Sequence, residues 1–163
     1  MSRYRPPAPK KSLYITPLGK RTLEDEQKAI WLRRREVVAA LSAAAAEGDR
    51  SENAEYIYRK KELREIDRRI RYLQKRLPEL QVVEQKPANR EQVFFGATVQ
   101  LMDEDESLVT YRIVGADEFD REKHYISVDS PLARSLLKRE LGDEVEVDVP
   151  SGLQRYYITD IEY

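Results

Sequence analysis

The chain has 163 residues and a mass of 19.1 kDa; 36% of its residues are charged and 40% are hydrophobic. This profile suits one or two small domains, and it favours a coiled coil with a modest core over one large globule. Cysteine is absent, which excludes disulfides and Cys-ligated metal sites, and no apolar run reaches the ~20 residues that span a bilayer. With no apolar signal segment at the N-terminus, we expect a cytoplasmic protein that has no membrane partner.

The net charge of −1 conceals an uneven distribution. Residues 1–90 contain 22 Lys or Arg and 13 Asp or Glu, whereas residues 91–163 contain 7 and 17. The excess of cations in the first part suits a polyanion or an acidic channel as its partner. The alternative is that the charges of a long solvated helix serve only solubility.

Residues 1–12 (MSRYRPPAPKKS) are rich in proline and basic residues and show no periodicity, which predicts a flexible tail. A helix is expected to begin at Thr16 and Pro17, because a Thr hydroxyl caps the first turn and Pro at the first helical position loses no needed donor. Gly48 is predicted to end this helix. Its heptad-like seam comprises Leu23, Gln27, Ile30, Arg34, Val37, Leu41 and Ala44, widened by Trp31, Val38 and Ala45.

A second helical run follows with the same spacing. Its seam comprises Tyr56, Arg59, Leu63, Ile66, Ile70, Leu73, Leu77 and Leu80. Pro78 argues against one regular helix through Leu80, since proline removes a hydrogen bond and clashes with the preceding turn. Because the connection is short, the two helices, each roughly 40 Å long, must run antiparallel. Residues 13–84 are therefore predicted to form a coiled-coil finger whose tip is residues 48–56.

Residues 85–92 are predicted to be a linker, because Pro87 and Asn89 interrupt regular structure. Beyond them the hydrophobic period shortens to about two, which is typical of strands. Strands are expected at residues 94–102, 108–115, 125–129, 144–149 and 155–161, with a short helix at residues 132–141. Residues 93–163 would then form a small β-sheet domain around one helix. The predicted fold class is α+β, a long antiparallel two-helix coiled coil followed by this domain.

Few residues suggest enzyme chemistry. The sequence contains no glycine-rich nucleotide-binding motif and no zinc-ligand spacing. His124 is the only histidine, and its position at the start of a predicted strand is typical of a structural residue. The acidic run at residues 103–106 lies in a predicted hairpin loop, where such residues are ordinarily solvated. We therefore do not expect an autonomous enzyme.

Basic side chains dominate the second helix near the tip. Spacings of three and four residues place several of them near one face, which suits phosphate contacts with RNA. The candidate nucleic-acid-binding residues are Arg59, Lys60, Lys61, Arg64, Arg68 and Arg71. The alternative is that these cations pair with acids of the same helix, as Glu65 would pair with Arg69.

The tip offers two carboxylates three residues apart, Asp49 and Glu52. This spacing fits a capping box, in which each side chain accepts an amide at the start of the second helix. The local pattern favours that interpretation. The alternative is that both carboxylates point outward and bind a hard cation. Because Mg²⁺ takes six oxygen ligands, a partner macromolecule would have to supply the others.

Three segments resemble the Gre transcript-cleavage factors of bacterial RNA polymerase. Residues 48–56 (GDRSENAEY) resemble the tip signature of that family, residues 15–17 (ITP) its opening, and residues 125–134 (YISVDSPLAR) its second conserved block. Residues 61–73 and 93–97 are more similar to the GreB branch than to GreA. The resemblance extends from about residue 13 to the C-terminus. Arg35 stands where the family usually has Pro, and residues 1–12 are not part of its pattern.

The resemblance implies an accessory factor without turnover of its own. By this resemblance, the finger would enter the polymerase secondary channel, and an FKBP-like C-terminal domain would bind the rim of the channel. Asp49 and Glu52 would help to hold Mg²⁺ that belongs to the polymerase active site, where backtracked RNA is hydrolysed. Asp129, Ser130 and Pro131 match the block that contacts the rim, and the basic residues of the second helix would follow the extruded RNA 3′ segment. We expect a monomer.

Two other functions stay open at this point. One is a non-catalytic or inhibitory occupant of the same channel, against which the Asp-x-x-Glu spacing at the tip argues. The other is a prolyl isomerase, suggested only by analogy with the FKBP fold. We expect no isomerase activity.

Overall fold

The computed structural model describes residues 4–48 and 52–163, and the chain divides into two compact units. The helical unit is Lys20–Leu80, and the β unit combines Met1–Gly19 with Gln81–Tyr163. Within the described residues, neither long helix is apolar enough over a sufficient length to cross a membrane.

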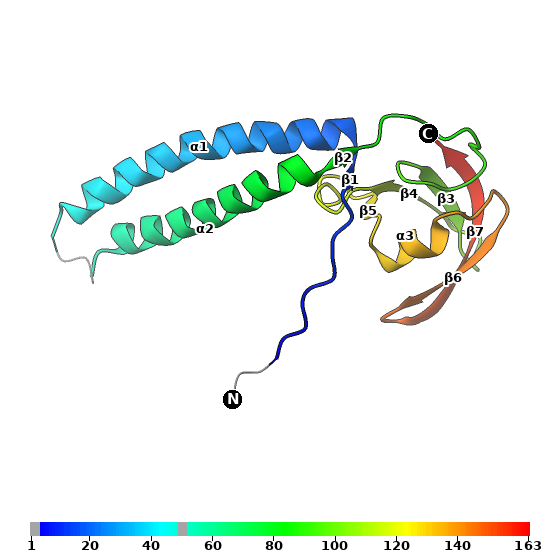
Figure 1. Cartoon of the computed structure of the whole chain (residues 1–163). Helices are drawn as coiled ribbons and strands as arrows, with labels where there is room; N and C mark the ends of the chain where they lie inside the picture. Colours follow the sequence, from blue (N-terminus) through cyan, green and yellow to red (C-terminus); the bar gives the residue numbers. More distant parts are fainter. Residues whose placement is uncertain (1–3, 49–51) are drawn as a thin grey trace. The chain divides into compact units, whose positions relative to one another are not determined.

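Two long helices form the helical unit. Helix α1 (Pro17–Ala45) and helix α2 (Ala54–Arg76) run antiparallel, as Figure 1 shows, which confirms the predicted helical pair. Helix α1 continues without interruption through Arg35. Regular helix stops at Arg76 and gives way to a short 3₁₀ turn (Leu77–Glu79), in keeping with the effect expected of Pro78.

The seam between the helices is narrow. Its buried centre is Val37, Ile66 and Ile70, against which the partly buried Ile30 and Leu63 pack. The prediction that Trp31 widens this seam was wrong, because its side chain is 42% exposed. Trp31 follows Ile30 by one residue, which turns its side chain by about 100° around the helix axis and away from α2.

Ion pairs join the two helices on either side of this seam. Arg34, a poor residue for an apolar seam, contacts Asp67 at 2.7 Å. Two further interhelical pairs are Arg33 with Glu62 at 2.7 Å and Arg69 with Glu26 at 2.6 Å. The hydrogen bond from Arg33 is the main cause that lowers the pKa of Glu62 from its ordinary value. Exposed pairs of this kind stabilise a fold by about 0–1 kcal/mol each, so their main effect is to specify the register of the helices.

A five-stranded sheet in the order β5-β4-β3-β7-β6 forms the body of the β unit. Neighbouring strands are antiparallel except for the parallel pair β4 and β5. The strands are β3 (Thr98–Met102), β4 (Leu108–Val114), β5 (Tyr125–Ser127), β6 (Glu144–Val149) and β7 (Gly152–Glu162). All five predicted strands are therefore present. Strand β3 begins later than expected because the chain turns at residues 94–97, where Gly96 has a φ of 88°.

Helix α3 (Pro131–Leu136) packs against the sheet through the fully buried Ala133 and Leu136. The predicted helix extended to residue 141. The observed helix is shorter because Leu137 leaves the helical region and Lys138 has a φ of 68°. The core of the β unit is made of Val93, Ala97, Val99, Leu101, Ile113, Val128, Ala133, Leu136, Val145 and Ile158.

A two-stranded parallel sheet also belongs to the β unit. Strand β1 (Tyr14–Ile15) pairs with strand β2 (Gln81–Val82), so segments more than sixty residues apart lie side by side. This sheet was not predicted, because two-residue strands are too short to show an alternating pattern. Residues 13–19 and 81–84, which the sequence pattern groups with the finger, thus lie within the β unit.

A buried carboxylate holds the start of α1 in the β unit. Glu118 is only 2% exposed and accepts hydrogen bonds from the amides of Thr16, at 2.9 Å, and Gly115, at 2.8 Å. It also accepts the hydroxyl proton of Thr16, whose oxygen in turn caps α1 by accepting the amide of Gly19 at 3.0 Å. A Cβ atom on Gly19 would lie 2.3 Å from a Glu118 oxygen. Glycine is therefore required there by close packing.

Candidate functional site

The tip of the helical unit is organised by Asn53. Its side-chain oxygen accepts the amide of Tyr56 at 3.0 Å and so caps the start of α2. Its side-chain nitrogen donates to the carbonyl of Ala44, near the end of α1, at 2.8 Å. One side chain therefore caps α2 and bonds to the last turn of α1, so it joins the two sides of the tip.

This arrangement differs from the expected capping box, in which Asp49 would cap the second helix. Helix α2 begins at Ala54 with Asn53 as its N-cap. Glu52 immediately precedes this cap; its side chain is exposed, and it makes no hydrogen bond or ion pair with the residues that the structure describes. Asp49 lies outside the described residues. Sequence reasoning missed Asn53, although Asn directly before Ala and Glu is a common helix start.

The six candidate nucleic-acid-binding residues of α2 fall into two groups. Arg59 pairs with Glu55 at 2.8 Å and with Glu62 at 3.1 Å, so the alternative of pairing within the helix holds for this residue. The hydrogen bond to Glu55 is the main cause that raises the pKa of Arg59. Lys60 lies over the ring of Tyr56, with its ammonium nitrogen 5.8 Å from the ring centroid.

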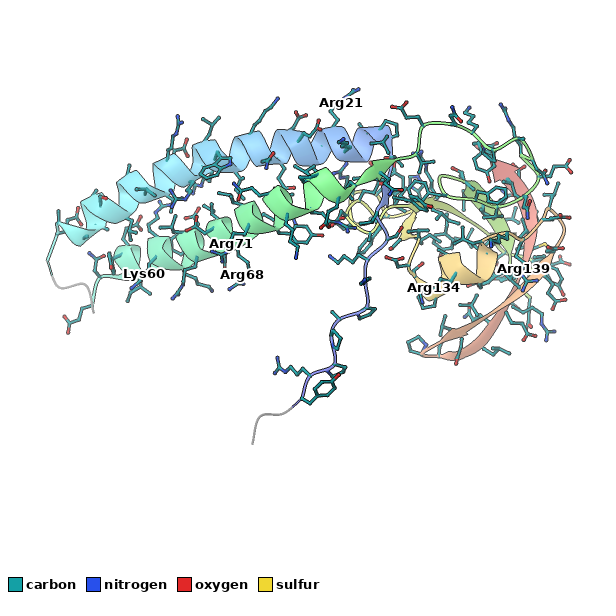
Figure 2. All side chains as sticks on the ribbon, in the orientation of Figure 1. Arg21, Lys60, Arg68, Arg71, Arg134 and Arg139 are labelled. Atoms are coloured by element: carbon teal, nitrogen blue, oxygen red, sulfur yellow. The ribbon has the colours of Figure 1, made fainter. Side chains whose placement is uncertain are left out.

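The other four candidates form an exposed row, which we call the basic row. Its members are Lys61, Arg64, Arg68 and Arg71. Their spacing of three and four residues places them on one face of α2, and within residues 4–48 and 52–163 none of them makes an ion pair. Figure 2 labels Lys60, Arg68 and Arg71 along this helix, and all three residues are exposed. The row is open to a polyanion.

The Asp129-Ser130-Pro131 segment lies in the β unit at the start of α3. The hydroxyl of Ser130 caps this helix by accepting the amide of Ala133 at 3.2 Å, and Pro131 occupies the first turn with an exposed side chain. A carboxylate oxygen of Asp129 accepts the amide of Ser12 at 2.8 Å. Ser130 and Asp129 thus both hold the local fold, whereas Pro131 presents an apolar surface.

Neither of the other sequence candidates forms a site. A carboxylate oxygen of Asp103 accepts the amides of Asp105 and Ser107 at 2.9 Å each, so this acidic residue shapes its hairpin loop. The ring of His124 packs edge-on against Tyr125, with 4.8 Å between the ring centroids. Across the part of the chain that the structure describes, no three acidic or histidine side chains gather as a metal site.

Two family models match the chain. The model described as "Transcription elongation factor, N-terminal" matches residues 13–82, and the model described as "Transcription elongation factor, GreA/GreB, C-term" matches residues 87–163. Among curated proteins, transcription elongation factor GreB of Xanthomonas axonopodis is 54% identical over 165 residues, which cover 100% of this chain and 98% of that protein. GreB of Pseudomonas aeruginosa is 53% identical with the same two coverages.

Solved structures show a more distant likeness. The chain is 21% identical to GreA factor homolog 1 of Thermus thermophilus, with a TM-score of 0.43, over 94% of this chain and 100% of that one.

Proposed function

Because the chain belongs to the GreA/GreB family of transcription elongation factors, we propose that it stimulates RNA cleavage by bacterial RNA polymerase. Its tip enters the polymerase secondary channel, and the polymerase then cleaves backtracked RNA and resumes elongation. The observation that carries this proposal is the exposed Glu52 carboxylate, held beside the Asn53 cap at the tip of two long helices. The protein itself is an accessory factor without turnover.

The donor set at the tip fits a shared metal ion. Carboxylate oxygens are the ligands that Mg²⁺ prefers, but two carboxylates leave most of its six positions unfilled. Asp49 and Glu52 would therefore hold the ion only together with ligands from the polymerase. When bound there, Mg²⁺ would activate water and stabilise the charge that develops on the scissile phosphate. Glu52 is suited to this role because it has no partner among the described residues that it would have to release.

The basic row provides the surface for the RNA. Lys61, Arg64, Arg68 and Arg71 are exposed and form no ion pairs with other described residues, so phosphate contacts cost no existing interaction. Lys60 extends the row toward the tip. Arg59 contributes less to RNA binding than its position near the tip indicates, because Glu55 and Glu62 already neutralise its charge.

The Asp129-Ser130-Pro131 segment provides the contact with the channel rim. Its exposed Pro131 lies at the first turn of α3, which the Ser130 cap and the buried Ala133 hold rigidly on the sheet. A rigid apolar side chain is well suited to a protein contact, since little conformational entropy is lost when it docks.

The direct test is cleavage of RNA in a stalled, backtracked polymerase complex, with and without the purified protein. We expect the protein to accelerate cleavage. Slower cleavage with the protein than without it would favour an inhibitory occupant of the channel instead.

Replacement of Asn53 separates its two contacts. We expect Asn53→Ala to lower the cleavage rate at saturating protein about tenfold, since a lost N-cap costs about 1 kcal/mol and loosens the segment that carries Glu52. Asn53→Ser keeps an uncharged capping oxygen and lacks the amide donor to Ala44, so its rate should lie between those of Asn53→Ala and wild type. Equal rates for all three proteins would contradict a positioning role for Asn53.

A further inference from the structure

The N-terminal tail, residues 4–12, is a charged segment that the proposed function leaves unused. The first twelve residues contain four Arg or Lys, three Pro and no acid, and they precede residue 13, where the family match begins. Residues 4–11 are exposed and form no helix or strand, and Tyr4 retains 84% of its surface. Proline at this density favours an extended polyproline conformation, so these eight residues reach about 25 Å.

The root of the tail is fixed to the candidate polymerase-binding segment. The amide of Ser12 donates to a carboxylate oxygen of Asp129 at 2.8 Å, and the hydroxyl of Ser12 accepts the amide of Tyr14 at 3.3 Å. The next residue, Leu13, accepts the amide of Gln81 beside the β1-β2 sheet. The tail is therefore attached directly beside Asp129. It is long enough to reach the surface around Pro131.

Two cations of the tail, Arg5 and Lys10, make no ion pair within the described part of the chain. The β unit is acidic, since residues 91–163 carry 7 Lys or Arg against 17 Asp or Glu. Arg5 and Lys10 nevertheless form no ion pair with any residue in the described part of the chain, and both are exposed. A basic segment that extends from an acidic surface is available to an external partner of negative charge.

We propose that residues 4–11 are a second polymerase-binding element, which contacts an acidic protein surface next to the site where Asp129-Ser130-Pro131 docks. This inference rests on the proposed function. The geometry favours a protein surface as the partner. The tail is attached at Asp129 and extends about 25 Å, so it stays close to the polymerase surface that Asp129-Ser130-Pro131 is proposed to contact. Charge complementarity makes that surface acidic.

Contacts of this kind act mainly through long-range attraction. Charges at the edge of an interface raise the association rate and make affinity depend on salt, because ions screen them beyond about 8 Å at physiological ionic strength. We expect the double variant Arg5→Gln/Lys10→Gln to bind polymerase about tenfold more weakly than wild type at low salt, with the difference vanishing at high salt.

Equilibrium binding of full-length protein to polymerase, measured by fluorescence anisotropy over a range of salt concentrations, tests this. The matched control is Lys123→Gln/Arg139→Gln, which removes the same charge from exposed positions of the β unit outside the tail. Wild-type affinity in the tail variant, or an equal loss in the control, would overturn the proposal. So would a tail variant that loses affinity for free RNA or DNA but not for polymerase, since the partner would then be nucleic acid. Failure of the wild-type protein to bind polymerase would overturn the proposed function as well.

Discussion

Replacing Asp49 with Asn, or Glu52 with Gln, is expected to reduce stimulated RNA cleavage on the order of 100-fold at saturating protein. Each amide keeps the size of the carboxylate but removes the charge that attracts a hard cation. Polymerase binding should be unchanged, because the proposed contacts with the channel rim and RNA lie on other residues. Single-turnover cleavage in a backtracked complex, with binding measured in parallel, reports both quantities.

Glu47→Gln is the matched control for these two variants. Glu47 is an exposed acid just beyond the end of α1. Its replacement by Gln removes the same charge close to the tip and leaves the Asp-x-x-Glu pair unchanged. Its cleavage rate should stay within about twofold of wild type, since isolated surface charges contribute little. Full activity in the Asp49→Asn/Glu52→Gln double variant would exclude the tip carboxylates from the reaction.

Glu118→Ala is expected to destabilise the β unit by about 3 kcal/mol. The substitution leaves the buried amides of Thr16 and Gly115 without an acceptor and removes the group that anchors the start of α1. Urea unfolding measures the loss, and hydrogen exchange at the amides of Thr16 and Gly115 locates it.

Two further variants serve as controls for Glu118→Ala. One removes the charge of Glu118 but keeps a polar side chain, and the other removes an exposed acid nearby. Glu118→Gln keeps a side-chain oxygen for one of the amides, so its loss of stability should be smaller than that of Glu118→Ala. Glu122→Ala removes an exposed acid from the same turn and should change stability by less than about 0.5 kcal/mol. A loss for Glu118→Ala no greater than that for Glu122→Ala would contradict an anchoring role.

Much of this fold could be predicted because local patterns specify it. The start of α1 follows from Thr16 and Pro17, and the alternating residues of β6 define that strand with the bounds 144–149. The departure from regular helix near Pro78 was likewise foreseeable, because proline blocks the helix by local sterics alone.

Features that depend on distant residues could not be predicted in this way. Glu118 meets Thr16 across 102 positions of sequence, and the β1-β2 pair joins segments at either end of the helical unit. Trp31 shows a different cause of error. Trp31 is apolar and adjacent to the seam residue Ile30, so the sequence pattern placed it in the seam. One residue corresponds to about 100° around the helix axis, which directs the side chain of Trp31 away from the partner helix.

The candidate site shows the same division. Local reasoning favoured Asp49 and Glu52 as a capping box and left a shared metal as the alternative, which the family resemblance then favoured. The structure assigns the cap of α2 to Asn53, which leaves the Glu52 carboxylate exposed. For the basic residues, the sequence located the exposed face but not the neutralisation of Arg59, which depends on side-chain geometry.

The central claim is that the tip lends metal ligands to the polymerase, and the Mg²⁺ dependence of cleavage tests it most directly. Cleavage rates are measured across a range of Mg²⁺ concentrations in a backtracked complex alone, with the wild-type protein, and with Glu52→Gln. The wild-type protein should lower the Mg²⁺ concentration required for half-maximal cleavage, because added carboxylates raise the affinity of the site. Glu52→Gln should return that concentration toward the value for polymerase alone. Stimulated cleavage with an unchanged Mg²⁺ requirement would contradict the claim.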